Sequence, residues 1–338
     1  MMKSYHANKG AGLASLALRE HDVPVPGPHE VLVRVRAASF NYRELAILWG
    51  TYPLPIKPDV VPLSDGAGEI VAIGEGVTRA KIGDRVAAAP IPLWTDGPFG
   101  GWDYAAQIGG SLDGLLTEYA LLNEEWIVHV PDHLSFEEAA ALPTAGITAW
   151  NALNGAGSLQ AGETVLTLGS GGVSLFTLQF AKLFGARVIA TTSSEEKAQR
   201  LRAIGADEVV NYRTTLNWHE VVRELTNGRG VDHVVESTSP GTLDLSIKAT
   251  ATPGRVTLVG WLPSDVSQVD IGAFFFNLVT LRPIFGGNRA HFIAMNEAIA
   301  QSQLRPIIDR VFPFEDAKAA YRYYEEAQPL GKVIISQG

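Results

Sequence analysis

The sequence predicts an α/β protein of two domains, one rich in β-strands and one built on a doubly wound parallel sheet. Three observations carry this prediction. The chain has 338 residues, enough for two domains of ordinary size. In residues 1 to about 125, short β-rich runs lie between clusters of Pro and Gly. After Glu163, buried-strand patterns alternate with helical ones, which is typical of a parallel sheet.

The composition is that of a globular protein. Hydrophobic residues make up 46% and charged residues 19%, which excludes a disordered or fibrous chain. The net charge is −9, whereas a general nucleic-acid binder would carry a basic surface. The absence of cysteine excludes disulfides, thiolate nucleophiles and thiolate metal sites. Since no segment resembles a signal peptide or membrane span, we expect a cytoplasmic protein that binds neither nucleic acid nor membranes.

In the first part of the chain, only residues 41–49 have a helical pattern. The strands expected there are short, and glycines recur between them at the spacing of turns. Their expected bounds are 31–36, 68–73 and 85–89. The tail of the chain is expected to form helices over 290–301 and 314–327 and a final strand over 332–335.

The second part opens with a continuous apolar run, as expected of a strand that is buried on both faces. Strand and helix patterns then alternate to about residue 259, and Ser194 is suited to cap one of the helices. The expected strands are 164–168, 187–191, 209–211, 231–236 and 255–259, and the expected helices are 173–184, 195–204, 218–225 and 243–249.

A glycine-rich loop follows the first of these strands and opens a helix. Its glycines allow the backbone to approach a pyrophosphate, and the helix N-terminus offers free N–H groups. A plain glycine turn would also explain the loop, but the alternating elements behind it favour a dinucleotide site. Ser174 replaces the third glycine of the usual pattern. The candidate phosphate-binding residues are Gly169, Ser170, Gly171, Gly172 and Val173.

The end of the second strand favours NADPH over NADH as the cofactor. NAD sites usually place an acidic residue there to bind the ribose 2′-hydroxyl. Here Thr192 and Ser193 lie in a run of hydroxyl residues, with no acid before Glu195. Lys197 and, at the end of the third strand, Tyr212 are then candidates for binding a 2′-phosphate. The alternative is that Lys197 is an ordinary exposed helix lysine.

Along nearly its whole length the chain resembles the medium-chain dehydrogenase/reductase superfamily. The motifs that carry the resemblance are GPHEVLVRV from Gly27, DGAGE from Asp65, IGEGV from Ile73, GDRV from Gly83 and the phosphate loop. The resemblance implies a GroES-like β-rich domain over 1–145 and 286–338 and a Rossmann domain over 146–285, with the active site in the cleft between them. It also implies that Thr148 contacts the cofactor, and Val259 and Phe285 complete the expected cofactor-binding set.

Zinc-dependent members of this family hold their catalytic metal with Cys, His and a further Cys or acidic residue. The matching positions here are Asn41, Ser64 and Thr144, which are neutral donors where zinc prefers thiolate, imidazole or carboxylate. The family's structural zinc lobe corresponds to residues 91–115, which contain no cysteine. We therefore expect neither metal.

The chain is most similar to the zinc-free quinone oxidoreductase and enoyl-reductase branch and to proteins labelled zinc-type alcohol-dehydrogenase-like. The motifs NYRE at 41–44 and GTY at 50–52 resemble that branch's active-site segment. We assign Asn41 to substrate orientation and Tyr52 to candidate proton donation. The alternative for Tyr52 is packing beside its neighbouring proline. Arg43 and Glu44 are expected to brace the segment as a charge pair.

This resemblance implies an NADPH-dependent, zinc-independent reductase of activated alkenes or quinones. Without a metal, a conjugated acceptor is favoured, because the charge left by hydride addition delocalises onto an oxygen that needs only hydrogen-bond donors. Two alternatives stay open. One is a metal-free alcohol dehydrogenase or carbonyl reductase, and the other is a nucleotide-binding protein without turnover.

Two further segments bear on the substrate pocket and on the oligomeric state. Aromatic residues in the loop 91–114 could shape an apolar substrate pocket, or could merely anchor a surface loop; they are Trp94, Phe99, Trp102 and Tyr104. The stretch from Ile271 to Leu281 is a candidate edge strand, too apolar to leave exposed. Because related enzymes dimerise through such edges, we expect a homodimer.

Overall fold

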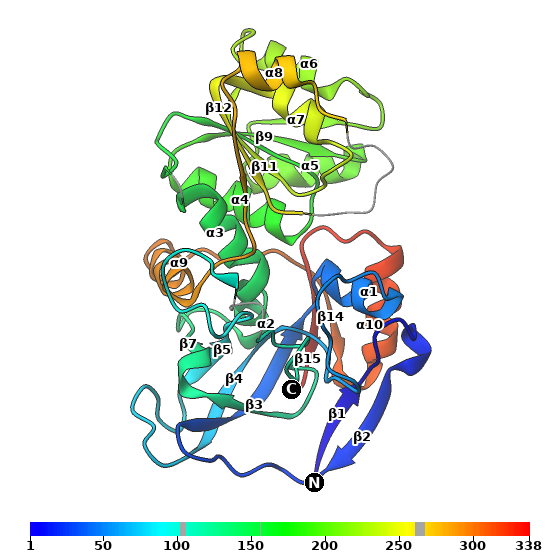
Figure 1. Cartoon of the computed structure of the whole chain (residues 1–338), viewed down its shortest axis with the longest axis vertical. Helices are drawn as coiled ribbons and strands as arrows, with labels where there is room; N and C mark the ends of the chain where they lie inside the picture. The colour runs from blue at the N-terminus through cyan, green and yellow to red at the C-terminus, as the bar shows by residue number, and fades with distance from the viewer. Residues whose placement is uncertain (102–105, 156, 261–267) are drawn as a thin grey trace. The chain divides into compact units, whose positions relative to one another are not determined.

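Figure 1 shows the computed structural model, which describes residues 1–101, 106–155, 157–260 and 268–338. The chain divides into two compact units. The first comprises Met1–Ile147 and Gly287–Gly338, and the second comprises Thr148–Gly286. The first unit is rich in β-strands and the second holds a parallel sheet, so the expected α/β fold class is confirmed.

The first unit is built on a sheet that joins the two ends of the chain. Its strands run in the order β14-β15-β3-β4-β5-β7, and β6 also pairs with β3. β15 lies antiparallel to β3, with Ile335 opposite Ala38, and β14 lies parallel to β15. The strands are β3 (Glu30–Ser39), β4 (Asp65–Ile73), β5 (Arg85–Ala88), β6 (Tyr119–Asn123), β7 (Ile127–His129), β14 (Ile308–Pro313) and β15 (Lys332–Ser336), beside a separate ribbon of β1 (Met2–His6) and β2 (Ala17–His21).

Alternating apolar residues of this sheet make the core of the first unit. Val31, Val33 and Val35 of β3 are buried in one cluster, as the two-residue period of a strand requires. Phe40 and Tyr321 meet edge to face in the same cluster, with ring centroids 4.7 Å apart. The helical segments are η1 (Leu13–Ser15), α1 (Tyr42–Trp49), η3 (Glu124–Trp126), α2 (Phe136–Ala140), the π-helix η4 (Leu142–Gly146), α9 (Arg289–Ser302), η5 (Phe314–Asp316) and α10 (Ala317–Glu326).

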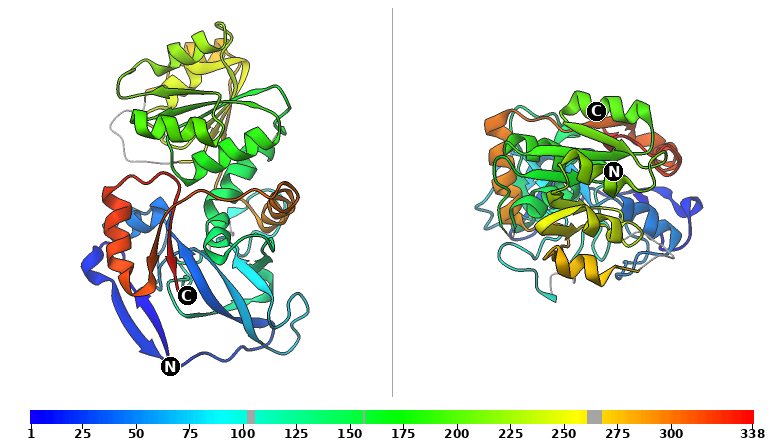
Figure 2. Two further views of the ribbon diagram at one scale, coloured as in Figure 1. Left: turned by 180° about the vertical axis from the view of Figure 1, so that it is seen from behind. Right: turned by 90° about the horizontal axis from the view of Figure 1, so that it is seen from above.

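The second unit is a doubly wound parallel sheet in the order β10-β9-β8-β11-β12-β13. α4 and α5 lie on one face of the sheet, and α6 and α7 lie on the other (Figures 1 and 2). The order reverses at β8, the strand that precedes the glycine-rich loop. The strands are β8 (Thr164–Thr167), β9 (Arg187–Thr192), β10 (Glu208–Asn211), β11 (Val231–Glu236), β12 (Thr250–Leu258) and β13 (Thr280–Pro283), and the helices are α3 (Ile147–Asn154), α4 (Gly172–Leu183), α5 (Glu195–Ile204), α6 (Trp218–Leu225), α7 (Leu243–Ala249) and α8 (Ile271–Phe276).

The expectation of one edge strand from Ile271 to Leu281 is wrong. The segment forms the helix α8 and then the short edge strand β13, which pairs in parallel with β12. The aromatic run has strong β-propensity, but Asp270 caps the helix by accepting a hydrogen bond from the N–H of Ala273 at 3.1 Å. Tertiary packing against α7 and local capping therefore override the propensity of the aromatic residues.

Within the described ranges, no helix combines the length and apolar character needed to span a membrane.

Of the loop aromatics, Trp94 is buried, meets Phe99 edge to face at 4.8 Å, and donates its indole N–H to the carbonyl of Gly97 at 3.0 Å. These contacts anchor the loop, which fits the plainer of the two expectations for Trp94 and Phe99. Trp102 and Tyr104 lie outside the described residues.

Glu124 is a buried carboxylate that fixes a loop of the first unit. It accepts hydrogen bonds from the backbone N–H groups of Thr78 at 2.7 Å and Arg79 at 2.8 Å, and from the His29 ring at 2.8 Å. The His29 bond first, and then the backbone bonds, lower the pKa of Glu124 from 4.5 to about 2. Because the folded pKa lies below the unfolded one, the carboxylate stabilises the fold above pH 4.5, and this stabilisation is lost as the pH falls towards 2.

Glu124→Gln is therefore expected to lower the free energy of unfolding at neutral pH by roughly 3 kcal/mol, at about 1.4 kcal/mol per pKa unit. It should also flatten the acid dependence of stability between pH 4.5 and 2. Chemical unfolding at neutral and acidic pH measures both effects, with the exposed Glu326→Gln as the matched control. An unchanged acid dependence in Glu124→Gln would contradict the assignment.

Candidate active site

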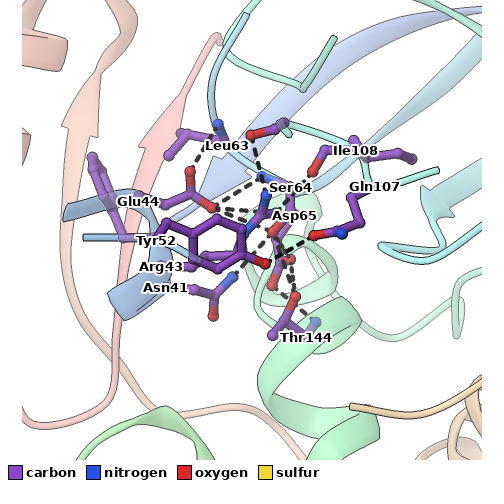
Figure 3. A network of polar contacts seen from close by, with 12 residues as sticks. Asn41, Arg43, Glu44, Tyr52, Leu63, Ser64, Asp65, Gln107, Ile108 and Thr144 are labelled. Atoms are coloured by element: carbon purple, nitrogen blue, oxygen red, sulfur yellow. Dashed lines mark hydrogen bonds and ion pairs between the residues drawn. The ribbon is translucent and has the colours of Figure 1, made fainter. Parts of the chain in front are cut away.

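The first unit contains a buried polar cluster (Figure 3). It is formed by residues at the starts of α1, β4 and β15 and by a residue of the π-helix η4. Asn41 is the residue before α1, Asp65 is the first residue of β4, and Lys332 is the first of β15. Thr144 lies in the π-helix η4, and Ser64 directly precedes β4. The side chains of Asn41, Ser64, Asp65 and Lys332 are all buried, so their polar atoms need partners inside the protein.

Asp65 is a charged acceptor inside the cluster. Its carboxylate accepts the hydroxyl of Thr144 at 2.5 Å and the backbone N–H of Thr144 at 3.0 Å. It also accepts the hydroxyl of Ser64 at 2.8 Å, and the ammonium of Lys332 lies 3.8 Å away. These donors satisfy the buried charge that Asp65 brings to the start of β4.

Lys332 places an ammonium group inside the first unit. It donates to the side-chain oxygen of Asn41 at 2.7 Å and to the backbone carbonyl of Phe40 at 2.5 Å. Burial lowers the pKa of Lys332, and the nearby carboxylates of Asp65 and Glu44 oppose that change. The Asn41 amide nitrogen faces the hydroxyl of Ser64, at the long distance of 3.4 Å.

Tyr52 and Arg43 extend the network along α1 and the loop after it. Arg43 donates to the carbonyls of Ile108 at 2.8 Å and Gly109 at 3.2 Å, and lies 3.8 Å from the carboxylate of Glu44. The expected bracing pair of Arg43 and Glu44 is thus confirmed. The guanidinium carbon lies 5.2 Å from the centre of the Tyr52 ring.

The Tyr52 hydroxyl donates to the side-chain oxygen of Gln107 at 2.8 Å. This bond orients the hydroxyl, and the role of Tyr52 as a proton donor stays a prediction. Glu44 accepts long bonds from the N–H groups of Leu63 at 3.3 Å and Ser64 at 3.4 Å, and its burial raises its pKa. Each oxygen of the Glu44 carboxylate therefore accepts a hydrogen bond from the backbone.

The three positions that correspond to zinc ligands are brought together by the fold. The Ser64 hydroxyl lies 3.4 Å from the Asn41 amide nitrogen and 3.5 Å from the Thr144 hydroxyl. Their chemistry does not fit zinc, because none can present a thiolate, imidazole or carboxylate. Among the residues that the structure describes, no three His, Cys, Asp or Glu side chains gather as metal ligands. The nearby ammonium of Lys332 would also repel a cation.

The backbone of the glycine-rich loop in the second unit is compatible with the expected dinucleotide site. Gly169 has a φ of 77°, and Gly171 precedes α4 with an extended backbone. A Cβ added at Gly171 would have no atom within 4 Å, so the protein itself leaves this space open. The Ser174 hydroxyl donates to the carbonyl of Leu168 at 2.6 Å, which explains how serine replaces the third glycine.

The candidate 2′-phosphate residues are arranged around the end of β9. The Tyr212 N–H donates to the carbonyl of Thr192 at 2.9 Å, and the Ser194 hydroxyl caps α5 by accepting the N–H of Lys197 at 3.3 Å. The buried hydroxyl of Thr192 has no hydrogen-bond partner among the described residues. These contacts bring β9, α5 and the end of β10 together. They join Thr192 to Tyr212, and Ser194 to Lys197.

The remaining expected cofactor residues are spread over the second unit. Thr148 is buried on α3, and the N–H of Val259 donates to the carbonyl of Glu236 at 2.9 Å after β12. Phe285 follows β13 and is half-buried. Their place in a cofactor site stays a prediction.

Sequence reasoning missed three members of the polar cluster, namely Asp65, Gln107 and Lys332. Asp65 was named only as part of a motif, although an acid at the start of an apolar strand was a usable signal. Lys332 likewise stands at the start of the apolar run of β15. Gln107 gave no such signal, because only the fold brings it to Tyr52, 55 positions away.

Two family models match the chain. One, described as an alcohol dehydrogenase GroES-like domain, matches residues 27–132, and one described as a zinc-binding dehydrogenase matches residues 172–301. Together with the two folds, they define a dehydrogenase of the class that combines a GroES-like domain with a Rossmann domain.

Three relatives place the chain more narrowly. It is 40% identical to a zinc-type alcohol dehydrogenase-like protein of Schizosaccharomyces pombe, covering 96% of each chain. It is 36% identical to a quinone oxidoreductase of Pseudomonas aeruginosa, covering 95% of each. A solved structure of an NAD-dependent alcohol dehydrogenase superposes with a TM-score of 0.90 at 32% identity, over all of both chains. The chain belongs to the medium-chain dehydrogenase/reductase superfamily and is an oxidoreductase.

Proposed function

We propose that this protein is an NADPH-dependent, zinc-independent reductase of activated alkenes or quinones. The observation that carries the proposal is the replacement of a zinc ligand set by Asn41, Ser64 and Thr144, which do not fit a metal. The Ser64 hydroxyl contacts both Asn41 and Thr144, and Ser64 and Thr144 both donate to Asp65. Similarity to a protein named quinone oxidoreductase, at 36% identity, supports the same reaction class.

A conjugated acceptor suits side chains that donate hydrogen bonds. When bound, the nicotinamide cofactor supplies a hydride, which is two electrons and one proton. An enone that accepted this hydride at its β-carbon would gain negative charge on its carbonyl oxygen, and a proton delivered to the α-carbon would complete the reduction. The Asn41 amide can donate to that oxygen, and the Tyr52 hydroxyl can donate a hydrogen bond or the proton.

An assay panel with the purified protein tests the reaction. NADPH oxidation should accompany loss of an enone and of a quinone, and zinc analysis should give substoichiometric metal with no loss of rate after chelation. Turnover of only an aldehyde or secondary alcohol would favour the carbonyl reductase alternative. NADPH binding without any turnover would favour the non-catalytic alternative. Stoichiometric zinc beside full activity would overturn zinc independence.

The preference for NADPH rests on hydroxyl residues and Lys197 where an NAD site usually has an acid. Lys197→Ala should raise the KM for NADPH about tenfold, since a hydrogen bond to a charged group contributes about 1.5 kcal/mol. The KM for NADH should change little, because NADH has no 2′-phosphate. Steady-state kinetics with both cofactors measures this, with the exposed Lys318→Ala as control. Equal effects on both cofactors would remove Lys197 from the phosphate site.

The apolar face of α8 supports a homodimer through the β13 edge. Ile271, Phe275, Phe276 and Leu278 are each at least 60% exposed, and β13 is the last strand of its sheet. Light scattering should give twice the chain mass of 36.3 kDa. The double variant Phe275→Asp with Phe276→Asp should move the protein towards the monomer. A monomeric mass for the unmodified protein would contradict this assembly.

A further inference from the structure

Lys332 is a buried lysine for which neither the family resemblance nor the proposed reaction provides a role. Only 3% of its surface is exposed, although lysine is almost never fully buried unless it is paired. Its ammonium donates hydrogen bonds to two neighbouring oxygens, the side-chain oxygen of Asn41 and the backbone carbonyl oxygen of Phe40. The lysine thus reaches from β15 to the residue that precedes α1, 291 positions earlier.

The contact fixes the orientation of the Asn41 amide. An ammonium group only donates hydrogen bonds, so the end of the amide that faces Lys332 must be the oxygen. The Asn41 nitrogen is then turned away, towards the Ser64 hydroxyl at 3.4 Å. Because Ser64 already donates its own proton to Asp65 at 2.8 Å, it can only accept from Asn41. Rotation of the amide by half a turn would place its N–H donors against the ammonium donors of Lys332. It would also place the amide oxygen against the accepting oxygen of Ser64.

The same ammonium balances charge in the cluster. Asp65 and Glu44 are buried carboxylates, and Arg43 stands 3.8 Å from Glu44 and bonds the carbonyls of Ile108 and Gly109. Lys332 lies 3.8 Å from Asp65 and is the cation on the Asn41 side of the network. Without it, a substrate oxygen that gains negative charge at Asn41 would meet an uncompensated carboxylate.

We propose that Lys332 is a positioning residue for reduction: it holds the Asn41 amide so that its nitrogen is the donor, with one N–H on Ser64 and the second N–H for the substrate, and it offsets the charge of Asp65. It thereby gives the metal-free site a fixed positive charge of the protein's own. The inference rests on the proposed function, because Asn41 donates to the substrate oxygen only in that reaction.

A double-mutant cycle tests whether Lys332 acts through Asn41. Lys332→Met keeps the length of the side chain and removes the charge, and should lower kcat about 10- to 100-fold, as expected for loss of an oriented donor. The KM for NADPH should stay within about twofold. In the Asn41→Ala background, Lys332→Met should lower kcat by less than about threefold further, because the amide it orients is absent. The exposed Lys318→Met is the matched control. Losses that multiply would overturn the inference.

A second variant separates positioning from folding. Lys332→Met with Asp65→Asn removes both charges and should recover much of the thermal stability lost in Lys332→Met alone. It should not recover kcat, because the Asn41 amide is still unoriented. Recovery of both stability and kcat would show that Lys332 merely neutralises Asp65, which contradicts the inference.

A readout without turnover keeps this inference distinct from the proposed function. In ¹⁵N-labelled protein, the side-chain amide signals of Asn41, assigned by their loss in Asn41→Ala, should shift in Lys332→Met and not in Lys318→Met. Unshifted signals would overturn the role of Lys332 even in an active enzyme. If the unmodified protein reduces no alkene or quinone, the proposed function fails, whereas shifted signals would still establish that Lys332 orients the amide.

Discussion

Asp65→Ala is expected to lower the free energy of unfolding of the first unit by about 3–5 kcal/mol, which is the usual cost of removing one partner from a buried charge pair. The substitution leaves Lys332 buried without its opposing charge. It also deprives the hydroxyls of Ser64 and Thr144 of their acceptor, at 2.8 and 2.5 Å. A loss of this size is a large fraction of the total stability of a typical domain.

Urea unfolding followed by tryptophan fluorescence measures the effect, and the exposed Asp132→Ala is the matched control. Asp65→Asn should cost less than Asp65→Ala, because an amide oxygen can still accept from Ser64 or Thr144. A loss below about 1 kcal/mol in Asp65→Ala would mean that water or a rearranged Lys332 compensates the cluster. The bonding scheme described above would then be wrong.

Local sequence patterns predicted the second unit well, because its elements are specified by neighbouring residues. The expected helices 195–204, 218–225 and 243–249 coincide with α5, α6 and α7. Each combines a helical period with clear ends, such as the Ser194 cap of α5. The prediction for the segment from Ile271 was wrong for the converse reason. Its aromatic residues favour a strand, whereas its conformation depends on the Asp270 cap and on packing against α7.

The polar cluster could be predicted only in part. The resemblance located Asn41, Ser64 and Thr144, and the structure brings them together. Lys332 could not be found in this way, because the pairing of β15 with β3 alone places it beside Asn41. The ribbon of β1 and β2 and the strand β14 were missed as well. All five residues of β2 are exposed, so β2 lacks the alternation that marks a strand.

Gly74 and Gly171 differ in what a side chain would meet at each position. A Cβ at Gly74 would lie 1.7 Å from the backbone oxygen of Gly27, so the fold of the first unit itself requires glycine there. A Cβ at Gly171 would meet nothing within 4 Å, and its φ of −77° suits any residue. The fold itself does not require glycine at 171, and we propose that its role there is to let a ligand, the pyrophosphate, approach the backbone.

Gly171→Val should consequently weaken cofactor binding strongly while it changes stability little. Overlap of the added methyl groups with a bound pyrophosphate should cost about 1–3 kcal/mol, which is roughly a 5- to 150-fold loss of affinity. The change at the start of α4 should cost about 1 kcal/mol of stability, because valine is a poorer N-cap residue than glycine. Titration of NADPH fluorescence and thermal unfolding without cofactor measure the two quantities.

Gly74→Ala is the converse control, since it should lower the melting temperature through its clash with Gly27 and leave the intrinsic affinity of the folded protein for NADPH unchanged. The opposite responses of the two variants distinguish a glycine kept for a ligand from one kept for the fold. If Gly171→Val bound NADPH as tightly as the unmodified protein, the phosphates would have to lie elsewhere. The loop between β8 and α4 would then be an ordinary turn, and the cofactor site would need to be sought at another edge of the sheet.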